Sequence, residues 1–107
     1  MTTATVDVTT SSDGTLVIHP LGRLDAEDTI GLRRTVVRAI RHDRPLRLVL
    51  DLTDAVDLDP INLGTLAAAC HLGDDHQVAV FLDHRSPALA ERLHAAGVPR
   101  HRLRHVS

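Results

Sequence analysis

The fold is decided by one stretch of the chain, LRLVLDLTDAVDLDPINLGTLAAAC, which occupies residues 46–70. Leucine recurs at every second position from 46 to 52, which predicts a strand with one buried face and one partly wet face. Asp59 and Pro60 then predict a helix start, because an acidic N-cap accepts free N–H groups and proline fits the first helical position. Gly73 is placed to end this helix.

Strand and helix signals continue on both sides of this stretch. Alternating and β-branched residues around a Ser-Ser-Asp-Gly turn predict an N-terminal hairpin. Right-handed crossovers through the later helices make the last four strands parallel. The order is therefore ββαβαβαβ, an α/β fold with a mostly parallel sheet in sequential strand order and helices on one face. The expected strands are residues 5–9, 15–21, 46–52, 78–82 and 103–106, and the expected helices begin at Asp25, Asp59 and Ser86 and end near His42, Gly73 and Gly97.

Length and composition predict one globular domain covering residues 1–107. Hydrophobic residues make up 43% and charged residues 24% of the chain, which excludes disorder and low complexity. The sequence lacks both a long apolar run and a leader pattern, so we expect a cytoplasmic protein without membrane insertion. The single cysteine, Cys70, excludes an internal disulfide and a multi-cysteine zinc site.

The charged residues exclude several function classes. All 12 basic residues are arginines, so chemistry that depends on a lysine amine, such as a Schiff base or a P-loop, is excluded. The formal net charge is −2 and Phe81 is the single aromatic residue, which argues against nucleic-acid binding. We expect neither an enzyme nor a bound cofactor.

Acidic residues gather where the expected strands end. Such tips meet at one edge of a parallel sheet, where carboxylates often bind Mg²⁺. The alternative is that these residues cap helices and form turns, and we expect weak Mg²⁺ binding at best. The residues concerned are Asp25, Asp51, Asp54, Asp57, Asp59 and Asp83.

The expected first helix has one apolar half and a narrow arginine stripe. The apolar half comprises Ile30, Leu32, Val36, Val37, Ala39 and Ile40. The stripe comprises Arg34, Arg38 and Arg41. Such a stripe is either a solvated face or a docking patch for an acidic partner.

The helix after Asp59 has an unusual outward face. Its core face comprises Leu63, Leu66, Ala67 and Cys70. The opposite face carries no charge and comprises Ile61, Gly64, Thr65, Ala68 and Leu72. A smooth apolar face of this kind either binds a partner or packs under another helix of the same domain.

Four short motifs occur in register along the chain: GRLD (22–25), LDL with VDLD (50–52 and 56–59), DPINLGTL (59–66) and LHAAGV (93–98). Together with the element order, they resemble the STAS domain, a family named for sulfate transporters and anti-sigma factor antagonists. This resemblance covers nearly the whole chain.

One motif departs from the family pattern D-S-[ST]-G-[LI]-x-x-L, although Asp59 and both leucines match. In anti-sigma factor antagonists, the second hydroxyl residue of this motif is phosphorylated by the anti-sigma kinase. Ile61 stands at that position, and Pro60 and Asn62 replace the flanking serine and glycine. The resemblance therefore implies a member without the phosphorylatable serine.

The resemblance implies a non-enzymatic module that binds a protein in partner-switching regulation. The implied partner is an anti-sigma factor or a serine-kinase-like ATPase, and a homodimer is compatible with the pattern. The alternative is a cytoplasmic STAS accessory subunit of a membrane transport complex. The expected contact residues are Asp25, Asp57, Asp59, Pro60, Ile61, Asn62, Gly64, Thr65 and Ala68.

Overall fold

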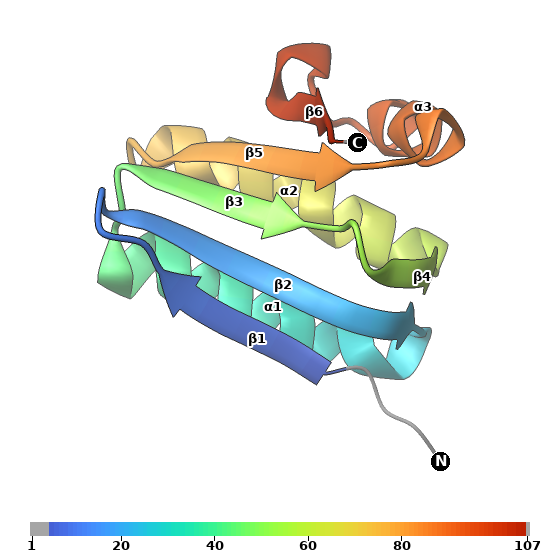
Figure 1. The fold of residues 1–107 in the computed structure, drawn as a ribbon, viewed down its shortest axis with the longest axis horizontal. Helices are drawn as coiled ribbons and strands as arrows, with labels where there is room; N and C mark the ends of the chain where they lie inside the picture. The colour runs from blue at the N-terminus through green and yellow to red at the C-terminus, as the bar shows by residue number, and fades with distance from the viewer. Residues whose placement is uncertain (1–4, 107) are drawn as a thin grey trace.

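A mixed sheet forms one layer of the structure, a computed structural model that describes residues 5–106 (Figure 1). Its strands are β1 (Thr5–Thr10), β2 (Thr15–Leu24), β3 (Arg47–Asp51), β4 (Ala55–Leu58), β5 (Ala79–His84) and β6 (Leu103–His105). The α-helices are α1 (Thr29–Arg38), α2 (Pro60–Asp75) and α3 (Pro87–Ala95). Short helical turns cover Ala26–Asp28, Ala39–Asp43 and Arg100–Arg102.

The main strand order is β1-β2-β3-β5-β6, in which β1 is antiparallel to β2 and the other neighbours are parallel. Figure 1 shows α1 and α2 side by side behind the sheet, and α3 packs beside α2. The predicted α/β fold with a mostly parallel sheet is therefore confirmed.

The short strand β4 was not among the expected strands, since the sequence analysis ended one strand at residue 52 and began the next helix at Asp59. The first part of β2 pairs with β3, and its end pairs with β4 in the register Gly22↔Ala55 and Leu24↔Leu58. Because β2 is longer than β3, its end has free backbone groups that β4 satisfies. This branch departs from a simple sequential order, and it brings the start of α2 beside the end of β2.

The core lies between the sheet and the helices. All four residues predicted for the core face of α2 are buried, and Leu66 has no exposed surface. Leu32 and Val36 of α1 are also buried, as predicted, together with the two residues that follow α1, Ala39 and Ile40. These residues form one cluster with the inward side chains of β2, β3 and β5.

Two aliphatic residues that were predicted to be buried, Leu46 and Ile30, are exposed. Leu46 is 82% exposed because β3 begins one residue later, so Leu46 lies outside the pleat. Ile30 is 70% exposed in the first turn of α1. In both cases, the prediction continued the apolar pattern beyond the residues that pack in the core.

The outer face of β3 is drier than predicted. Val49 is only 6% exposed, since it pairs with Val17 on one side and Phe81 on the other. Three guanidinium groups surround the Phe81 ring at 5.0–5.9 Å from its centroid, those of Arg47, Arg102 and Arg104. These long arginine side chains help to shield Val49 and Phe81 from water.

The first helical segment ends at Asp43, near the predicted His42, but in an unexpected form, and the second helix ends later than predicted. After Arg38 the helix widens into a π-turn, which closes when the N–H of Arg44, in the left-handed region, donates to the Ala39 carbonyl at 3.0 Å. Gly73 does not end α2, which continues to Asp75. A Cβ at position 73 would lie 2.5 Å from Val80 Cγ2, so glycine permits the close approach of α2 to β5.

Candidate functional site

The start of α2 is held by a side-chain cap. The Asp59 carboxylate accepts the N–H of Ile61 at 3.0 Å, and Pro60 occupies the first helical position, as predicted. The N–H of Asp59 donates to the Leu24 carbonyl at 3.0 Å. This geometry fixes Ile61 in the first turn with 57% of its surface exposed.

Asn62, which was expected to contact a partner, is fully buried. Its amide nitrogen donates to the carbonyls of Leu24 and Asp25 at 3.1 and 2.9 Å, and its amide oxygen accepts the Thr29 hydroxyl at 3.1 Å. Its side chain is therefore not part of the exposed surface on which the partner contact was predicted. Its three bonds instead join the end of β2, the start of α1 and the start of α2.

The exposed face of α2 lies next to this buried amide. Ile61, Gly64 and Ala68 are exposed, and Thr65 is half-buried with its hydroxyl donating to the Ile61 carbonyl at 3.2 Å. A Cβ added at Gly64 would meet no atom within 4 Å, so the space above the helix is open.

The same face forms one wall of a groove against α1, which we call the α1–α2 groove. Its volume is about 570 Å³. The interpretation that another helix packs on this face holds for one edge, which α1 covers. Ile61, Gly64 and Ala68 stay exposed, and partner binding by this face stays a prediction. The groove is lined by Thr29, Arg33, Val36, Val37, Arg41, Ile61, Gly64, Thr65, Ala68, Ala69, Leu72 and Asp75.

Two exposed apolar residues near the start of α2 were not predicted as site residues. Val56 on β4 is 79% exposed, and Ile30 at the start of α1 is 70% exposed. Large apolar side chains with this exposure are further candidate contacts for a partner. Val56 was missed with its strand, and Ile30 was missed because it was assigned to the buried half of its helix.

Three of the predicted acidic residues, Asp25, Asp57 and Asp59, lie after β2, on β4 and before α2. Asp25 and Asp57 flank Arg23 in loose ion pairs, with N–O distances of 3.5 and 3.6 Å. All three side chains are more than half exposed, so each pair contributes little to stability. Asp59 is committed to the helix cap, which leaves Asp25 and Asp57 as the acidic edge of the surface.

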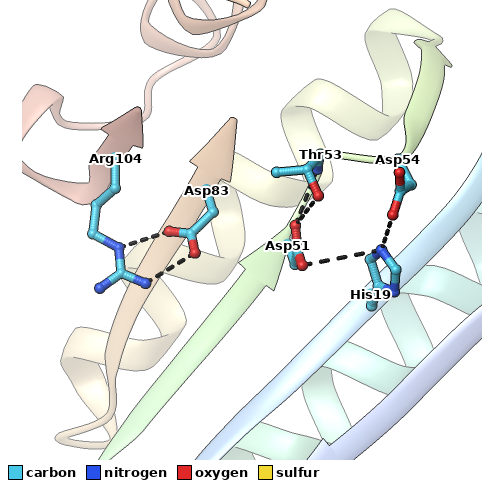
Figure 2. Close-up of polar contacts among 6 residues, drawn as sticks. All are labelled: His19, Asp51, Thr53, Asp54, Asp83 and Arg104. Carbon is cyan, nitrogen blue, oxygen red and sulfur yellow. Dashed lines mark hydrogen bonds and ion pairs between the residues drawn. The ribbon is translucent and has the colours of Figure 1, made fainter. Parts of the chain in front are cut away.

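The remaining strand-end acids are engaged by neighbouring side chains (Figure 2). Asp83 accepts two hydrogen bonds from Arg104 at 2.6 and 3.0 Å. Asp51 accepts the N–H and the hydroxyl of the threonine two residues later, at 3.1 and 2.6 Å, and Asp54 lies 2.7 Å from His19 Nε2. Within residues 5–106, no group of three His, Cys, Asp or Glu side chains is arranged to hold a metal ion.

Two titratable groups in the interior have shifted pKa values. Burial raises the pKa of the Cys70 thiol to about 11, which keeps it protonated and a poor nucleophile. Burial, followed by the nearby His105, lowers the pKa of His84. Neither group lines the α1–α2 groove.

Within the part of the chain that the structure describes, no helix is long and apolar enough to cross a membrane.

The family model for the STAS domain matches residues 8–103, and the chain belongs to the STAS domain family. Members of this family are generally non-catalytic. A comparison with curated proteins gives no match.

Solved structures share the fold. An anti-sigma factor antagonist from Mycobacterium paratuberculosis has a TM-score of 0.78 and 24% identity, over 95% of this chain and 86% of that one. Unphosphorylated SpoIIAA, an anti-sigma factor antagonist and Bacillus cell fate determinant, has a TM-score of 0.76 and 14% identity, over 96% of this chain and 89% of that one. The murine anion transporter Slc26a9 has a TM-score of 0.68 and 17% identity, over 89% of this chain and 17% of that one.

Proposed function

We propose that this STAS domain is a non-enzymatic protein-binding module that acts like an anti-sigma factor antagonist and lacks the phosphorylatable serine. Its partner in this proposal is an anti-sigma factor or a serine-kinase-like ATPase. The main support for this proposal is the exposure of Ile61. Its surface is 57% exposed in the first turn of α2, at the position that the family motif gives to the phosphorylated residue.

The charge of this surface explains how the proposed contact would differ from a contact that phosphorylation switches off. SpoIIAA has been solved in both an unphosphorylated and a phosphorylated form. A phosphate adds nearly two negative charges, and here it would stand beside Asp57 and Asp59 and repel an apolar partner. An isoleucine cannot accept a phosphate, so the surface stays in its binding state.

The nearest hydroxyl on the same face belongs to Thr65, one helical turn after Ile61. It donates to the Ile61 carbonyl at 3.2 Å and is part of the wall of the α1–α2 groove. This local bond and its half-buried position support the proposal that Thr65 does not replace the missing serine.

The second candidate is a STAS accessory subunit of a membrane transport complex. It is favoured by the fold similarity to the Slc26a9 anion transporter. The same surface of α2 would then dock on a transporter component, so the identity of the partner separates the two candidates.

Capture from the source cells tests the proposal. Tagged wild-type chain and Ile61→Glu are used in parallel, and the retained proteins are identified by mass spectrometry. We expect the wild-type chain to retain an anti-sigma factor or a serine-kinase-like ATPase that Ile61→Glu loses. Recovery of a transporter component instead would favour the second candidate.

Leu46→Glu is the matched control. Leu46 is 82% exposed and precedes β3, at the end of the sheet opposite to the start of α2 (Figure 1). It should retain the same partner as the wild-type chain. Equal capture by Ile61→Glu and the wild type would contradict the proposed site.

A further inference from the structure

The outer face of α1 carries an unusual concentration of positive charge. The segment from residue 29 to residue 42 contains no acidic residue. Its four arginines are exposed, and none of the ion pairs within residues 5–106 involves them. These residues, the basic face of α1, are Arg33, Arg34, Arg38 and Arg41.

This concentration of positive charge is local to the basic face of α1, since the whole chain has a formal net charge of −2. Elsewhere, several arginines are paired with acids, as Arg104 is with Asp83 and Arg100 with Glu91. The unpaired arginines of α1 therefore create a field that favours an anionic partner at one face rather than over the whole surface.

The basic face of α1 borders the α1–α2 groove. Arg33 and Arg41 line it directly, while Val36 and Ala69 are buried at its base. On α2 the lining positions recur every three or four residues from Ile61 to Asp75, so the groove follows nearly the full length of that helix. A helix of this length extends about 20 Å, which matches a bound segment of three to four turns.

The opposite wall allows a backbone to approach closely. Gly64 and Ala68 are small and exposed, and space above Gly64 is open. Small residues at such positions lose little side-chain entropy on binding. The groove thus combines an apolar base, a smooth wall on α2 and a cationic rim on α1, with Asp75 as its one acidic lining residue.

We propose that the α1–α2 groove binds an acidic amphipathic helix of the partner protein. The apolar residues of that helix would seat between α1 and α2, and its carboxylates would face Arg33 and Arg41. Helix-in-groove binding of this kind uses apolar anchors spaced by three or four residues. This inference rests on the proposed function, since it names the chemistry of the segment that the α2 surface receives.

A designed peptide tests the inference even before the partner is identified. The probe is a fluorescent helical peptide of about 18 residues, with leucine at helix-periodic positions and glutamate on both flanks. The comparison peptide keeps the leucines and has lysine in place of glutamate. We expect the acidic peptide to bind, to weaken as salt rises, and to bind at least about tenfold more tightly than the lysine peptide.

Variants of the chain test whether the acidic peptide binds in the α1–α2 groove. Arg33→Glu combined with Arg41→Glu should weaken the acidic peptide at least about tenfold, and Ala68→Gln should weaken it by filling the groove with a neutral side chain. Arg85→Glu is the control, because Arg85 is exposed before α3 and does not line the groove. Equal weakening by Arg85→Glu, or equal binding of both peptides, would overturn the inference.

The captured partner separates this inference from the proposed function. If the partner is lost by Ile61→Glu but binds Arg33→Glu/Arg41→Glu with unchanged affinity and salt dependence, the acidic-helix inference fails and the proposed function stands. If Ile61→Glu keeps the partner, the proposed function itself fails. Loss of the partner in both variants, with retention by Arg85→Glu, supports both.

Discussion

Replacing Ile61 with glutamate should abolish partner binding and leave the fold nearly unchanged. Ile61 is 57% exposed, so less than half of its side chain contributes to folding. Full burial of an isoleucine contributes roughly 1.5–3 kcal/mol, and the loss here should be about 1 kcal/mol. A new carboxylate in the first turn of α2 recovers about 0.3–1 kcal/mol through the helix dipole.

The net change in the free energy of unfolding is therefore below about 1 kcal/mol, which corresponds to a shift of about 4 °C or less in Tm for a domain of this size. Binding responds differently, because a charge at the centre of an apolar contact is desolvated without a partner. A penalty of about 3 kcal/mol lowers affinity more than about 100-fold.

The assay combines thermal unfolding by circular dichroism with titration calorimetry against the purified partner. Leu66→Glu serves as the opposite case, because Leu66 has no exposed surface and a buried unpaired charge should unfold the domain. An Ile61→Glu protein that melts many degrees below the wild type would refute the reasoning and show that Ile61 belongs to the core.

Three further predictions concern the interior. Asn62→Ala should lower the free energy of unfolding by about 2–3 kcal/mol, since it removes three hydrogen bonds of a buried side chain and leaves the Thr29 hydroxyl without its acceptor; urea unfolding measures it, and an unchanged midpoint would contradict the assigned role. Burial lowers the pKa of His84 below its ordinary value of 6.5, so the unfolded chain binds the proton first as pH falls from 6.5 towards the folded pKa, and stability should fall. His84→Gln should reduce this dependence of the free energy of unfolding on pH, and identical pH profiles of variant and wild type would contradict the prediction. Cys70 has a pKa of about 11 and should resist alkylation at about pH 8 until urea unfolds the chain; rapid reaction of the native protein would show that the thiol is accessible.

Local signals in the sequence were sufficient for most of the fold. Asp59 with Pro60 and Ser86 with Pro87 each form a cap within a few residues of chain, and both helices begin where predicted. Helix caps depend on groups close in sequence, so they can be recognised from the local sequence alone.

Features that depend on distant segments were missed. Residues of β4 form a strand because the end of β2, more than 30 residues earlier, extends past β3 and offers unpaired backbone groups. Asn62 lies at a position that helical periodicity alone leaves open, and its burial depends on carbonyls at the end of β2. Pairings of this kind cannot be derived from the local pattern around each residue.

The exposed face of α2 was predicted from the sequence, and the structure adds the groove that it forms with α1. The exposure of Ile61, Gly64 and Ala68 follows from the helical period and agrees with the sequence analysis. The contribution of α1 did not follow, because the distance between two helices is a property of packing. Arg33 was left out of the predicted stripe although it lines the α1–α2 groove.

The central claim is that the α2 surface binds its protein partner without a phosphorylation switch. Its most direct test is the affinity of the wild-type chain for the purified partner, measured with and without ATP and Mg²⁺, followed by mapping of modified peptides. Equal affinities and no phosphate on residues 59–68 are expected. Release of the wild-type chain on addition of ATP, with phosphate on Thr65, would contradict it.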